Sequence, residues 1–491
     1  MEGQGLLEHQ GAATAPLTNI GVRAGRGLRW SLLGNLSTKM GSFAVGLVLA
    51  RLLTPSDFGF YALALAATTF ALHINDVGII AATVQWRGRV EDMAPTAATM
   101  AIVFSSLVYG AFWVLAPAFA ALAGSPAATP VVRLLTAVIL VDGVTAVWSA
   151  TLQRRFEQDK LLKANIAGYV VNASLSIALA ANGAGPYSFA VGHVAGWVVT
   201  GVLVFTWARV PVRFGLDREI AAKLLRFGIP LAASLGVEAL LINADYVIVG
   251  RELGASAVGL YMLAFNVSSW VPGVIGTAVR YVSVATFSRL AEHDHEALSL
   301  GVQRWVPLLL AVVLPSAVLM AALAHPLVGL YGQQWGQSAE VLRFLVVLMV
   351  GRMLTSLAFD ILTSLGATRS SLLLNLAWAV VLIPVLVVGT RLDGIRGAAI
   401  GHALVALLVA VPLAIVAVRR AGVQLRPIVP ALVRPCLGGA MAGAVVMLLA
   451  GVVDGGPGFE LCVAGGAGMV TALLVNVRPR QVRQLRVKFA S

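Results

Sequence analysis

Two stretches share one pattern: LARLLTPSDFGFYALALAATTF at residues 49–70 and VGRELGASAVGLYMLAFNVSSW at residues 249–270. They align without a gap, at an offset of two hundred residues. The identical pairs are Arg51/Arg251, Leu53/Leu253, Ser56/Ser256, Gly59/Gly259, Tyr61/Tyr261, Leu63/Leu263 and Ala64/Ala264. Apolar bias alone would not reproduce the Arg, Gly and Tyr pairs. The repeat therefore indicates a duplicated helical bundle, an arrangement common in secondary transporters.

The composition places the chain in a membrane. Its 491 residues are 59% hydrophobic and only 12% charged, with a mean hydropathy of +0.88, which excludes an ordinary soluble protein. Apolar runs of about 20 residues, long enough to cross a bilayer, fill nearly the whole length. Because backbone groups must satisfy one another inside lipid, these spans are predicted to be helices. We count about fourteen, between residues 28 and 477.

The basic residues predict the topology. With the N-terminus placed inside, 26 of the 35 lysines and arginines fall in inner loops and tails, six at outer ends and three within spans. This asymmetry is the positive-inside signal, and it places both termini in the cytoplasm. The net charge of +13 then faces the anionic headgroups of the inner leaflet. Nucleic acid is therefore not an expected partner.

The repeat offset covers six spans, so both copies enter the membrane in the same direction. The predicted fold is an all-α integral membrane protein with about fourteen transmembrane helices. Two parallel six-helix halves are related by a pseudo-two-fold axis along the membrane normal, and a further helix pair follows. The predicted parts are a cytoplasmic tail at 1–27, an N-terminal bundle at 28–215, a C-terminal bundle at 216–425, the helix pair at 426–477 and a basic cytoplasmic tail at 478–491.

Charged residues inside the spans are candidates for function, because a charge in a bilayer is costly unless it faces a cavity or a partner. Arginine and lysine bind phosphate oxygens through charge-assisted hydrogen bonds, so a cationic cavity between the halves suits a phosphate-bearing substrate. The candidate bases are Lys39, Arg280, Arg352, Arg51 and Arg251. The candidate acids, for a coupling ion or for charge balance, are Asp76, Asp142, Glu238, Asp245 and Asp360. For each residue an internal salt bridge or a snorkelling side chain is the alternative. That alternative is favoured for Arg51 and Arg251, which lie near Asp57 and Glu252 at the membrane edge.

Other polar residues carry weaker signals. His73, His193 and His402 lie within spans and could titrate near neutral pH, but we expect them to be packed or hydrogen-bonded. Cys436 and Cys462 are expected to be buried and unreactive. The sequence contains no GxxxxGK[ST], HExxH or GxSxG motif, and His293 and His295 around Asp294 form only a weak metal pattern. We therefore expect no enzymatic activity, no metal and no cofactor, and any work must be drawn from the flux of the substrate itself or from an ion gradient, with H⁺ and Na⁺ as the candidate coupling ions.

The segment LARLLTPSDFG at 49–59, with Tyr61 and NDVGI at 75–79, resembles the N-terminal signature of bacterial polysaccharide transporters, the Wzx-type oligosaccharide flippases. These belong to the multidrug/oligosaccharidyl-lipid/polysaccharide (MOP) exporter superfamily, whose layout of fourteen spans the chain also resembles. The resemblance implies an inner-membrane flippase that carries an undecaprenyl-pyrophosphate-linked oligosaccharide to the periplasmic leaflet by alternating access, coupled to an ion gradient. It also implies surrounding membrane lipids, a polysaccharide polymerase and chain-length machinery as partners in exopolysaccharide, capsule or lipopolysaccharide synthesis.

Three alternatives differ in testable ways. A lipid II flippase of the same superfamily would share the layout. A MATE-like drug/cation antiporter would need an acid-rich cavity, against which Lys39, Arg280 and Arg352 argue. A membrane polymerase or glycosyltransferase would usually present a sizeable outer loop with catalytic acids or bases, whereas the outer loops here are short and carry almost no charge.

Overall fold

The fold is helical wherever the structure describes the chain. The computed structural model describes residues 39–75, 90–155, 157–211, 213–270, 273, 295–365, 367–425, 428–450, 452–453 and 455–476. These ranges contain helices and turns but no strand, and ten of their helical segments are long and apolar enough to cross a membrane. The predicted all-helical membrane fold is therefore confirmed, whereas the count of fourteen spans stays a prediction.

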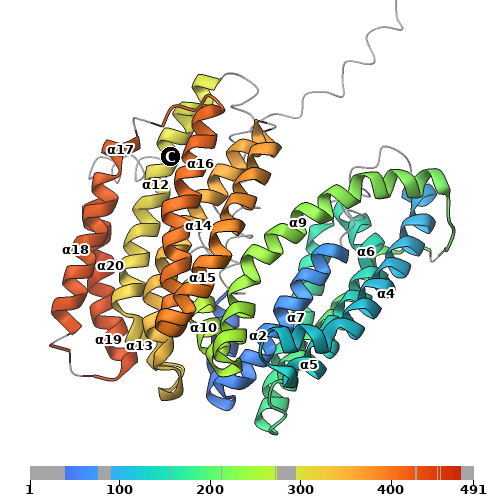
Figure 1. Cartoon of the computed structure of the whole chain (residues 1–491), viewed down its shortest axis with the longest axis horizontal. Coiled ribbons are helices and arrows are strands. Elements are labelled where there is room, and N and C mark those ends of the chain that lie inside the picture. The colour runs from blue at the N-terminus through green and yellow to red at the C-terminus, as the bar shows by residue number, and fades with distance from the viewer. Residues whose placement is uncertain are drawn as a thin grey trace, which may run out of the picture.

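The helices form two bundles that meet at one end and lie apart at the other (Figure 1). In the first bundle, α4, α6 and α8 pack in succession and α7 packs on α8. This bundle begins with the helix of residues 39–52. Its other elements are α2 (Pro55–Asn75), α4 (Val90–Leu122), η1 (Pro126–Ala128), α5 (Thr129–Thr136), α6 (Val138–Arg154), α7 (Gln158–Ala181) and α8 (Tyr187–Ala208).

The second bundle begins with α9, which packs against both α2 and α15 and so links the two bundles. At 36 residues, α9 is about 54 Å long, well beyond a hydrocarbon core of about 30 Å, and Figure 1 shows it arching down to the base where the bundles meet. The elements are α9 (Arg218–Leu253), α10 (Ala255–Ser268), α12 (His295–Ala322), α13 (Ala324–Gly329), η2 (Gln333–Trp335), α14 (Gln337–Ser364), α15 (Thr368–Val405), η3 (Ala406–Ala410) and α16 (Val411–Arg420).

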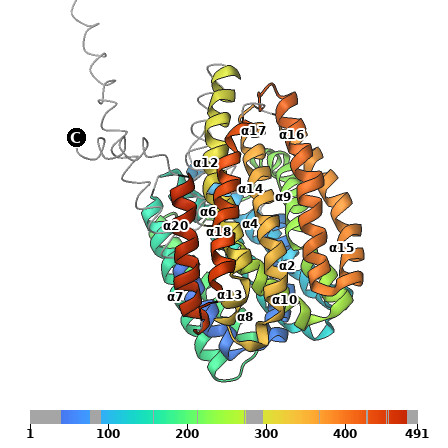
Figure 2. The same cartoon turned by 90° about the vertical axis from the view of Figure 1, so that its left-hand side faces the viewer.

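The last helices lie on the side of the second bundle that faces away from the first, toward the viewer of Figure 2. There α18 and α20 pack against each other and against α12. Cys436 and Cys462 in this part are exposed, so the expectation that they are buried was wrong: each lies on an outer helix face that lipid can cover. The elements are α17 (Ile428–Ala431), α18 (Val433–Ala450), α19 (Pro457–Glu460), η4 (Leu461–Gly465) and α20 (Gly466–Asn476).

The first copy of the repeat encodes a capping box at the start of α2. The Thr54 amide donates to Asp57 Oδ2 at 2.9 Å, and the Asp57 amide donates to Thr54 Oγ1 at 3.3 Å. Pro55 holds the first helical position, where its fixed φ is favourable. The second copy has Gly254 at the position of Thr54, with φ +83°. This backbone conformation suits glycine and lets α9 end and α10 begin at one residue.

The two copies contact each other reciprocally where α2 crosses α10. A Cβ added at Gly59 would overlap the carbonyl oxygen of Ala255, and one added at Gly259 would overlap the carbonyl oxygen of Pro55. Pro55 and Ala255 are equivalent positions of the repeat, so the contact is self-complementary, as at a two-fold interface. Glycine at both sites permits the close backbone approach.

Further hydrogen bonds join the bundles at the same end. The indole nitrogen of Trp335, which is fully buried, donates to the carbonyl of Ala50 at 2.9 Å. The Arg51 guanidinium donates to the carbonyl of Leu330 at 2.7 and 3.2 Å. All these residues lie at helix ends that the charge distribution predicts to be outer. The described contacts thus close the predicted outer end, while Figure 1 shows the bundles apart at the end where α16 and α17 meet.

Candidate substrate and coupling sites

A buried acid, imidazole and phenol meet in the second bundle. Asp245 of α9 is 1% exposed, and its Oδ2 lies 2.7 Å from Nδ1 of His402 on α15. The Tyr261 hydroxyl of α10 donates to the same oxygen at 2.6 Å. The other oxygen, Oδ1, has no hydrogen-bond partner among the described residues. A carboxylate this buried is stable only if it is paired or protonated, and the contacts with His402 and Tyr261 supply partners for it.

Arg352 adds a cation near this group. Its guanidinium carbon lies 5.7 Å from the centre of the Phe265 ring on α10. It is also within electrostatic range of the hydroxyls of Tyr246 and Tyr261, whose rings are 6.2 Å apart. The structure therefore places two predicted site residues, Arg352 of α14 and Asp245 of α9, around the same pair of tyrosines.

The first bundle repeats part of this geometry without the acid. The hydroxyl of Tyr61, the repeat counterpart of Tyr261, lies 3.4 Å from Nδ1 of His193 on α8. The indole nitrogen of Trp197 donates to Nε2 of the same histidine at 3.1 Å. The position that corresponds to Asp245 holds Val45. The acid thus distinguishes the second copy from the first.

Lys39 lies where the bundles face each other. Its amino group lies against Gly273 of the second bundle: if Gly273 carried a Cβ atom, that atom would be 2.9 Å from Lys39 Nζ. Two residues further on, a Cβ added at Gly41 would lie 3.6 Å from the Tyr169 ring of α7, and Phe43 packs against Trp270 with ring centroids 4.2 Å apart. The helix of residues 39–52 is therefore placed between α7 on one side and the second bundle on the other.

The two repeat-equivalent arginines lie elsewhere. Arg51 and Arg251 are both exposed at the outer end, and Arg51 donates to a backbone carbonyl across the bundle contact. Glu252 forms an ion pair with Arg391 at 3.0 Å. The structure thus does not bring Arg51 or Arg251 together with Lys39, and a phosphate-binding role for them stays a prediction.

The remaining predicted acids are scattered. Inside the first bundle, the side-chain NH₂ group of Asn75 donates to Asp142 Oδ2 of α6 at 2.9 Å. The side-chain oxygen of Asn75, Oδ1, accepts a hydrogen bond from the Ser105 hydroxyl at 2.8 Å. Asp360 lies on α14, eight residues beyond Arg352, and Glu238 lies on α9 with a side chain that the structure does not describe. The described residues do not include Asp76, Arg280, His293 or Asp294. Of His295 they include only the backbone.

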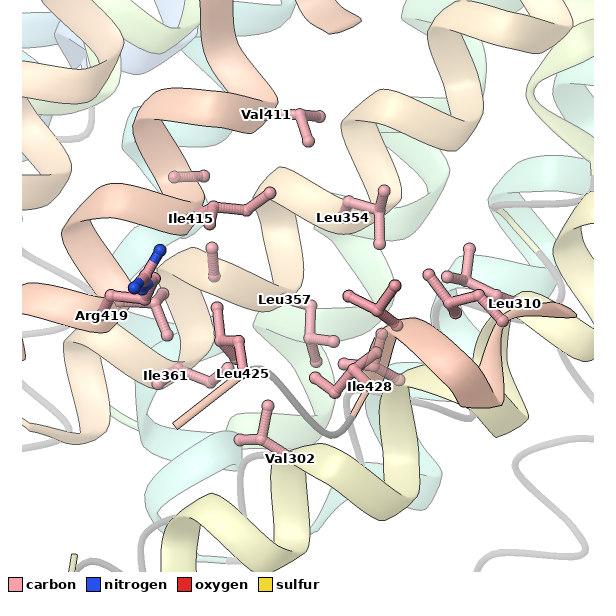
Figure 3. Close-up of a pocket in the computed structure, with 16 residues that line it drawn as sticks. Val302, Leu310, Leu354, Leu357, Ile361, Val411, Ile415, Arg419, Leu425 and Ile428 are labelled. Carbon is pink, nitrogen blue, oxygen red and sulfur yellow. The ribbon is translucent and has the colours of Figure 1, made fainter. Parts of the chain in front are cut away.

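Two cavities differ in chemistry. Figure 3 shows the first, of about 320 Å³, lined by apolar side chains of α12, α14, α16 and the segment after α16, with Arg419 at one edge. A polar headgroup would lose its hydrogen bonds to water there, so this cavity suits hydrocarbon. The second, of about 250 Å³, lies between α7 and α8 and is lined by Asn165, Gly168, Tyr169, Asn172, His193, Gly196, Trp197 and Thr200. In the described part of the chain no cluster of His, Cys, Asp or Glu could hold a metal ion.

Comparison with known proteins decides the family. Residues 48–340, more than half of the chain, match the family described as "Polysaccharide biosynthesis protein". The chain belongs to this family. The predicted resemblance to polysaccharide transporters is thereby confirmed.

Two curated relatives of this polysaccharide biosynthesis protein illustrate the match. The succinoglycan biosynthesis transport protein ExoT of Rhizobium meliloti (strain 1021) is 25% identical over 323 residues, which cover 66% of this chain and 65% of ExoT, just under two thirds. The lipopolysaccharide biosynthesis protein WzxC of Escherichia coli (strain K12) is 22% identical over 385 residues, 78% of each chain.

Among solved structures, the lipid II flippase MurJ in its inward closed conformation superposes with a TM-score of 0.75 and 12% identity. The match covers 90% of this chain and 97% of MurJ. At this identity the likeness shows the fold alone. It agrees with the predicted MOP-type arrangement of helices.

Sequence reasoning on this polysaccharide biosynthesis protein missed two sets of residues. His402 was expected to be packed or hydrogen-bonded, but its pairing with Asp245 was not predicted. The signal is a second short repeat, AVGH at 190–193 and AIGH at 399–402. Its first histidine contacts Tyr61 directly, and its second shares an oxygen of Asp245 with Tyr261. The polar residues between α7 and α8 were also missed, because the search for function followed charges.

Proposed function

We propose that this protein is a flippase that moves an undecaprenyl-pyrophosphate-linked oligosaccharide from the cytoplasmic to the periplasmic leaflet, for the synthesis of a surface polysaccharide. The observation that carries the proposal is the position of Lys39, a cation within the membrane where the two bundles face each other. A charge at such a place is costly unless it meets a cavity or a counter-charge. A pyrophosphate headgroup offers two such counter-charges, which lysine and arginine bind well.

Alternating access follows from the two ends of the molecule. The described contacts join the bundles at the predicted outer end, around Gly59 and Gly259, so we assign this state as open toward the cytoplasm. That is the side on which the substrate would load. The positive-inside distribution supports an inner-membrane location with both termini in the cytoplasm. On the outer side the substrate would pass to a polymerase and its chain-length machinery.

We assign a proton as the coupling ion and Asp245 with His402 as its site. A protonated carboxyl can donate a hydrogen bond, whereas a carboxylate only accepts, so a proton added at Asp245 changes its bonds to His402 and Tyr261. Tyr261 lies two residues beyond Gly259 on α10, so this change acts beside the contact that closes the outer end. A proton entering from outside would return the empty carrier to the inward-open state, and its release to the cytoplasm would accompany loading.

Transport of a polysaccharide precursor is preferred over the alternatives for specific reasons. The family match favours polysaccharide synthesis, whereas the MurJ likeness extends only to the fold. A cationic drug would be repelled by Lys39 and Arg352. An enzyme would need a constellation of catalytic groups open to water, whereas Asp245, His402 and Tyr261 are buried and bonded to one another.

The test is translocation of an undecaprenyl-pyrophosphate-linked oligosaccharide by the purified protein in proteoliposomes, read as loss of the sugar from the loaded leaflet. Replacing Lys39, Arg280 or Arg352 with Ala should abolish translocation while the protein still inserts. Arg218→Ala, an exposed arginine at the start of α9, is the matched control and should keep the wild-type rate. Wild-type rates in all three variants would remove the phosphate-binding role.

A further inference from the structure

We infer that the polar pocket between α7 and α8 binds the sugar next to the pyrophosphate of the transported lipid. The inference rests on the proposed function in treating that sugar as part of a lipid-linked substrate. The pocket, of about 250 Å³, is smaller than the roughly 300–1,000 Å³ of drug-sized ligand sites. That size suits a compact unit such as one sugar ring.

The polar lining is arranged at helical spacing on both helices. Asn165, Tyr169 and Asn172 lie at positions i, i+4 and i+7 of α7, which share one helix face. His193, Trp197 and Thr200 have the same spacing on α8, and all six line the pocket. Two facing polar stripes on membrane helices indicate a common polar space between them.

The polar stripes lie on a different side of the helices from most of their exposed apolar residues. Turned away from these stripes, the two helices carry exposed apolar side chains that suit contact with lipid; these are Val170, Val198, Val202 and Phe205. Polar side chains in spans face the protein interior or a water-filled cavity. The ring of Tyr169 meets the helix of residues 39–52 at Gly41, two residues from Lys39. The pocket therefore adjoins the same stretch of helix that carries the predicted phosphate ligand.

The pocket is neutral, which separates a sugar from an ion. Its lining contains no acidic or basic side chain apart from His193. The Trp197 indole donates to His193 Nε2, so that nitrogen carries no proton and the imidazole is uncharged. A neutral site gives no advantage to a cationic drug or to a phosphate. It suits the many hydroxyls and the apolar ring faces of a carbohydrate.

The hydrogen-bonding groups have capacity for a ligand. The Tyr169 hydroxyl is buried beside Gly41, at the edge of the pocket, and has no hydrogen-bond partner among the described residues; this is unfavourable, so a small turn of the ring toward a ligand in the pocket would cost no existing bond with a described residue. An asparagine amide offers two donors and an acceptor; Asn172 Oδ1 already accepts from the Ser176 hydroxyl at 3.1 Å, so its NH₂ group and the amide of Asn165 are the groups that remain for a ligand. The rings of Tyr169 and Trp197 are amphipathic and can pack on a sugar face while their polar atoms remain bonded.

Close approach of the helices shapes the pocket. A Cβ added at Gly168 would lie 2.5 Å from the Gly196 carbonyl oxygen, and one added at Gly196 would lie 2.6 Å from the Gly168 carbonyl oxygen. Small residues permit this approach of two membrane helices. The floor of the pocket is thus fixed by backbone, and its polar side chains stand at defined positions around it.

The experiment measures binding to the full-length protein in detergent with two kinds of probe. The first kind is undecaprenyl pyrophosphate, bare or carrying one galactose, glucose or N-acetylglucosamine. The second is the free methyl glycoside of each sugar, detected by saturation-transfer NMR. We expect at least one sugar-bearing lipid to bind more tightly than the bare lipid. Tyr169→Phe and Asn172→Ala should each reduce that added affinity about fivefold, the effect of one lost hydrogen bond.

Matched controls separate ligand binding from folding. Tyr187→Phe on the exposed start of α8 and Asn182→Ala at the exposed end of α7 should leave both probes unaffected. Because the Tyr169 hydroxyl has no described partner, Tyr169→Phe should not lower the melting temperature. A variant that lost bare-lipid binding as well as sugar binding would indicate a structural role and overturn the inference.

The remaining outcomes are distinct. If lipids bind but a sugar adds nothing, or the variants lose nothing, the sugar site is overturned while the flippase proposal stands. If no lipid pyrophosphate binds but a methyl glycoside does, in a way sensitive to Tyr169 and Asn172, the sugar site stands and the flippase proposal falls. If no probe of either kind binds, both are overturned.

Discussion

Asp245 and His402 are separated by 157 residues in sequence, yet their side chains lie 2.7 Å apart and are almost completely buried. The pair joins α9 to α15, and Tyr261 of α10 completes it at 2.6 Å from the same oxygen. Three helices of the second bundle therefore meet at the Asp245 carboxyl group. Arg352 lies within electrostatic range of Tyr261 and of the neighbouring Tyr246.

The first prediction concerns the proton. Asp245→Asn should abolish acceleration of transport by an imposed pH gradient, because an amide can still accept the Tyr261 hydrogen bond but cannot take up a proton. The measurement is proton uptake into proteoliposomes, followed with a pH-sensitive dye during translocation. Asp393→Asn is the control, since Asp393 is exposed and its pair with Arg396 at 3.5 Å contributes at most about 1 kcal/mol to stability. Gradient-driven transport by the Asp245 variant would reject this site.

The second prediction compares the two histidines of the AVGH and AIGH motifs. His402→Ala leaves a buried carboxylate without its imidazole, and breaking a buried charged pair of this kind costs about 3–5 kcal/mol. His193→Ala removes only neutral hydrogen bonds with Trp197 and Tyr61, at about 1–3 kcal/mol. The free energy of unfolding should therefore fall more in the His402 variant. Denaturant titration in detergent measures the free energy of unfolding of each variant. If both variants lost the same amount, the Asp245–His402 pair would carry no charge.

Much of the fold could be predicted from the sequence because it depends on local signals. Apolar length predicted the helices, and the repeat predicted that residues 55–59 and 255–259 are equivalent, as their reciprocal contact shows. Within α15, non-helical backbone at Asp393 and Gly394 breaks a continuous apolar stretch of the chain into two helical parts.

The site was less predictable, for a physical reason. Charges in spans can be read from sequence one at a time, which found Lys39, Asp245 and Arg352. Which charge meets which partner depends on how helices pack, and packing paired Asp245 with His402, 157 residues away in sequence. Neutral polar residues such as Asn172 give no charge signal, although the i, i+4, i+7 spacing on α7 and α8 would have revealed them.

The third prediction tests whether the repeats are parallel. In a Cys436→Ser, Cys462→Ser background, Pro55→Cys and Ala255→Cys should both react with a membrane-impermeant maleimide added from outside. Both native cysteines are exposed, so they must be removed first. A cysteine at position 218, at the other end of α9, should react only after the membrane is opened. Labelling of positions 55 and 255 from opposite sides would refute the common direction of the two copies.

The last prediction concerns the contact between Gly59 and Gly259. Gly59→Ala or Gly259→Ala places a methyl group against a backbone carbonyl of the opposite helix, and overpacking of this kind costs about 1–3 kcal/mol. The cost applies only while the outer end is closed, so the equilibrium between the inward-open and outward-open states should shift toward the outward-open state. Each 1.4 kcal/mol of cost shifts this equilibrium by roughly tenfold. Faster maleimide labelling of Ala255→Cys in the Gly59 variant would report the shift, together with slower transport. Gly46→Ala is the control, because an added Cβ there meets nothing within 4 Å. Unchanged labelling in a folded Gly59 variant would show that α2 and α10 do not separate during the cycle, and that some other contact closes the outer end.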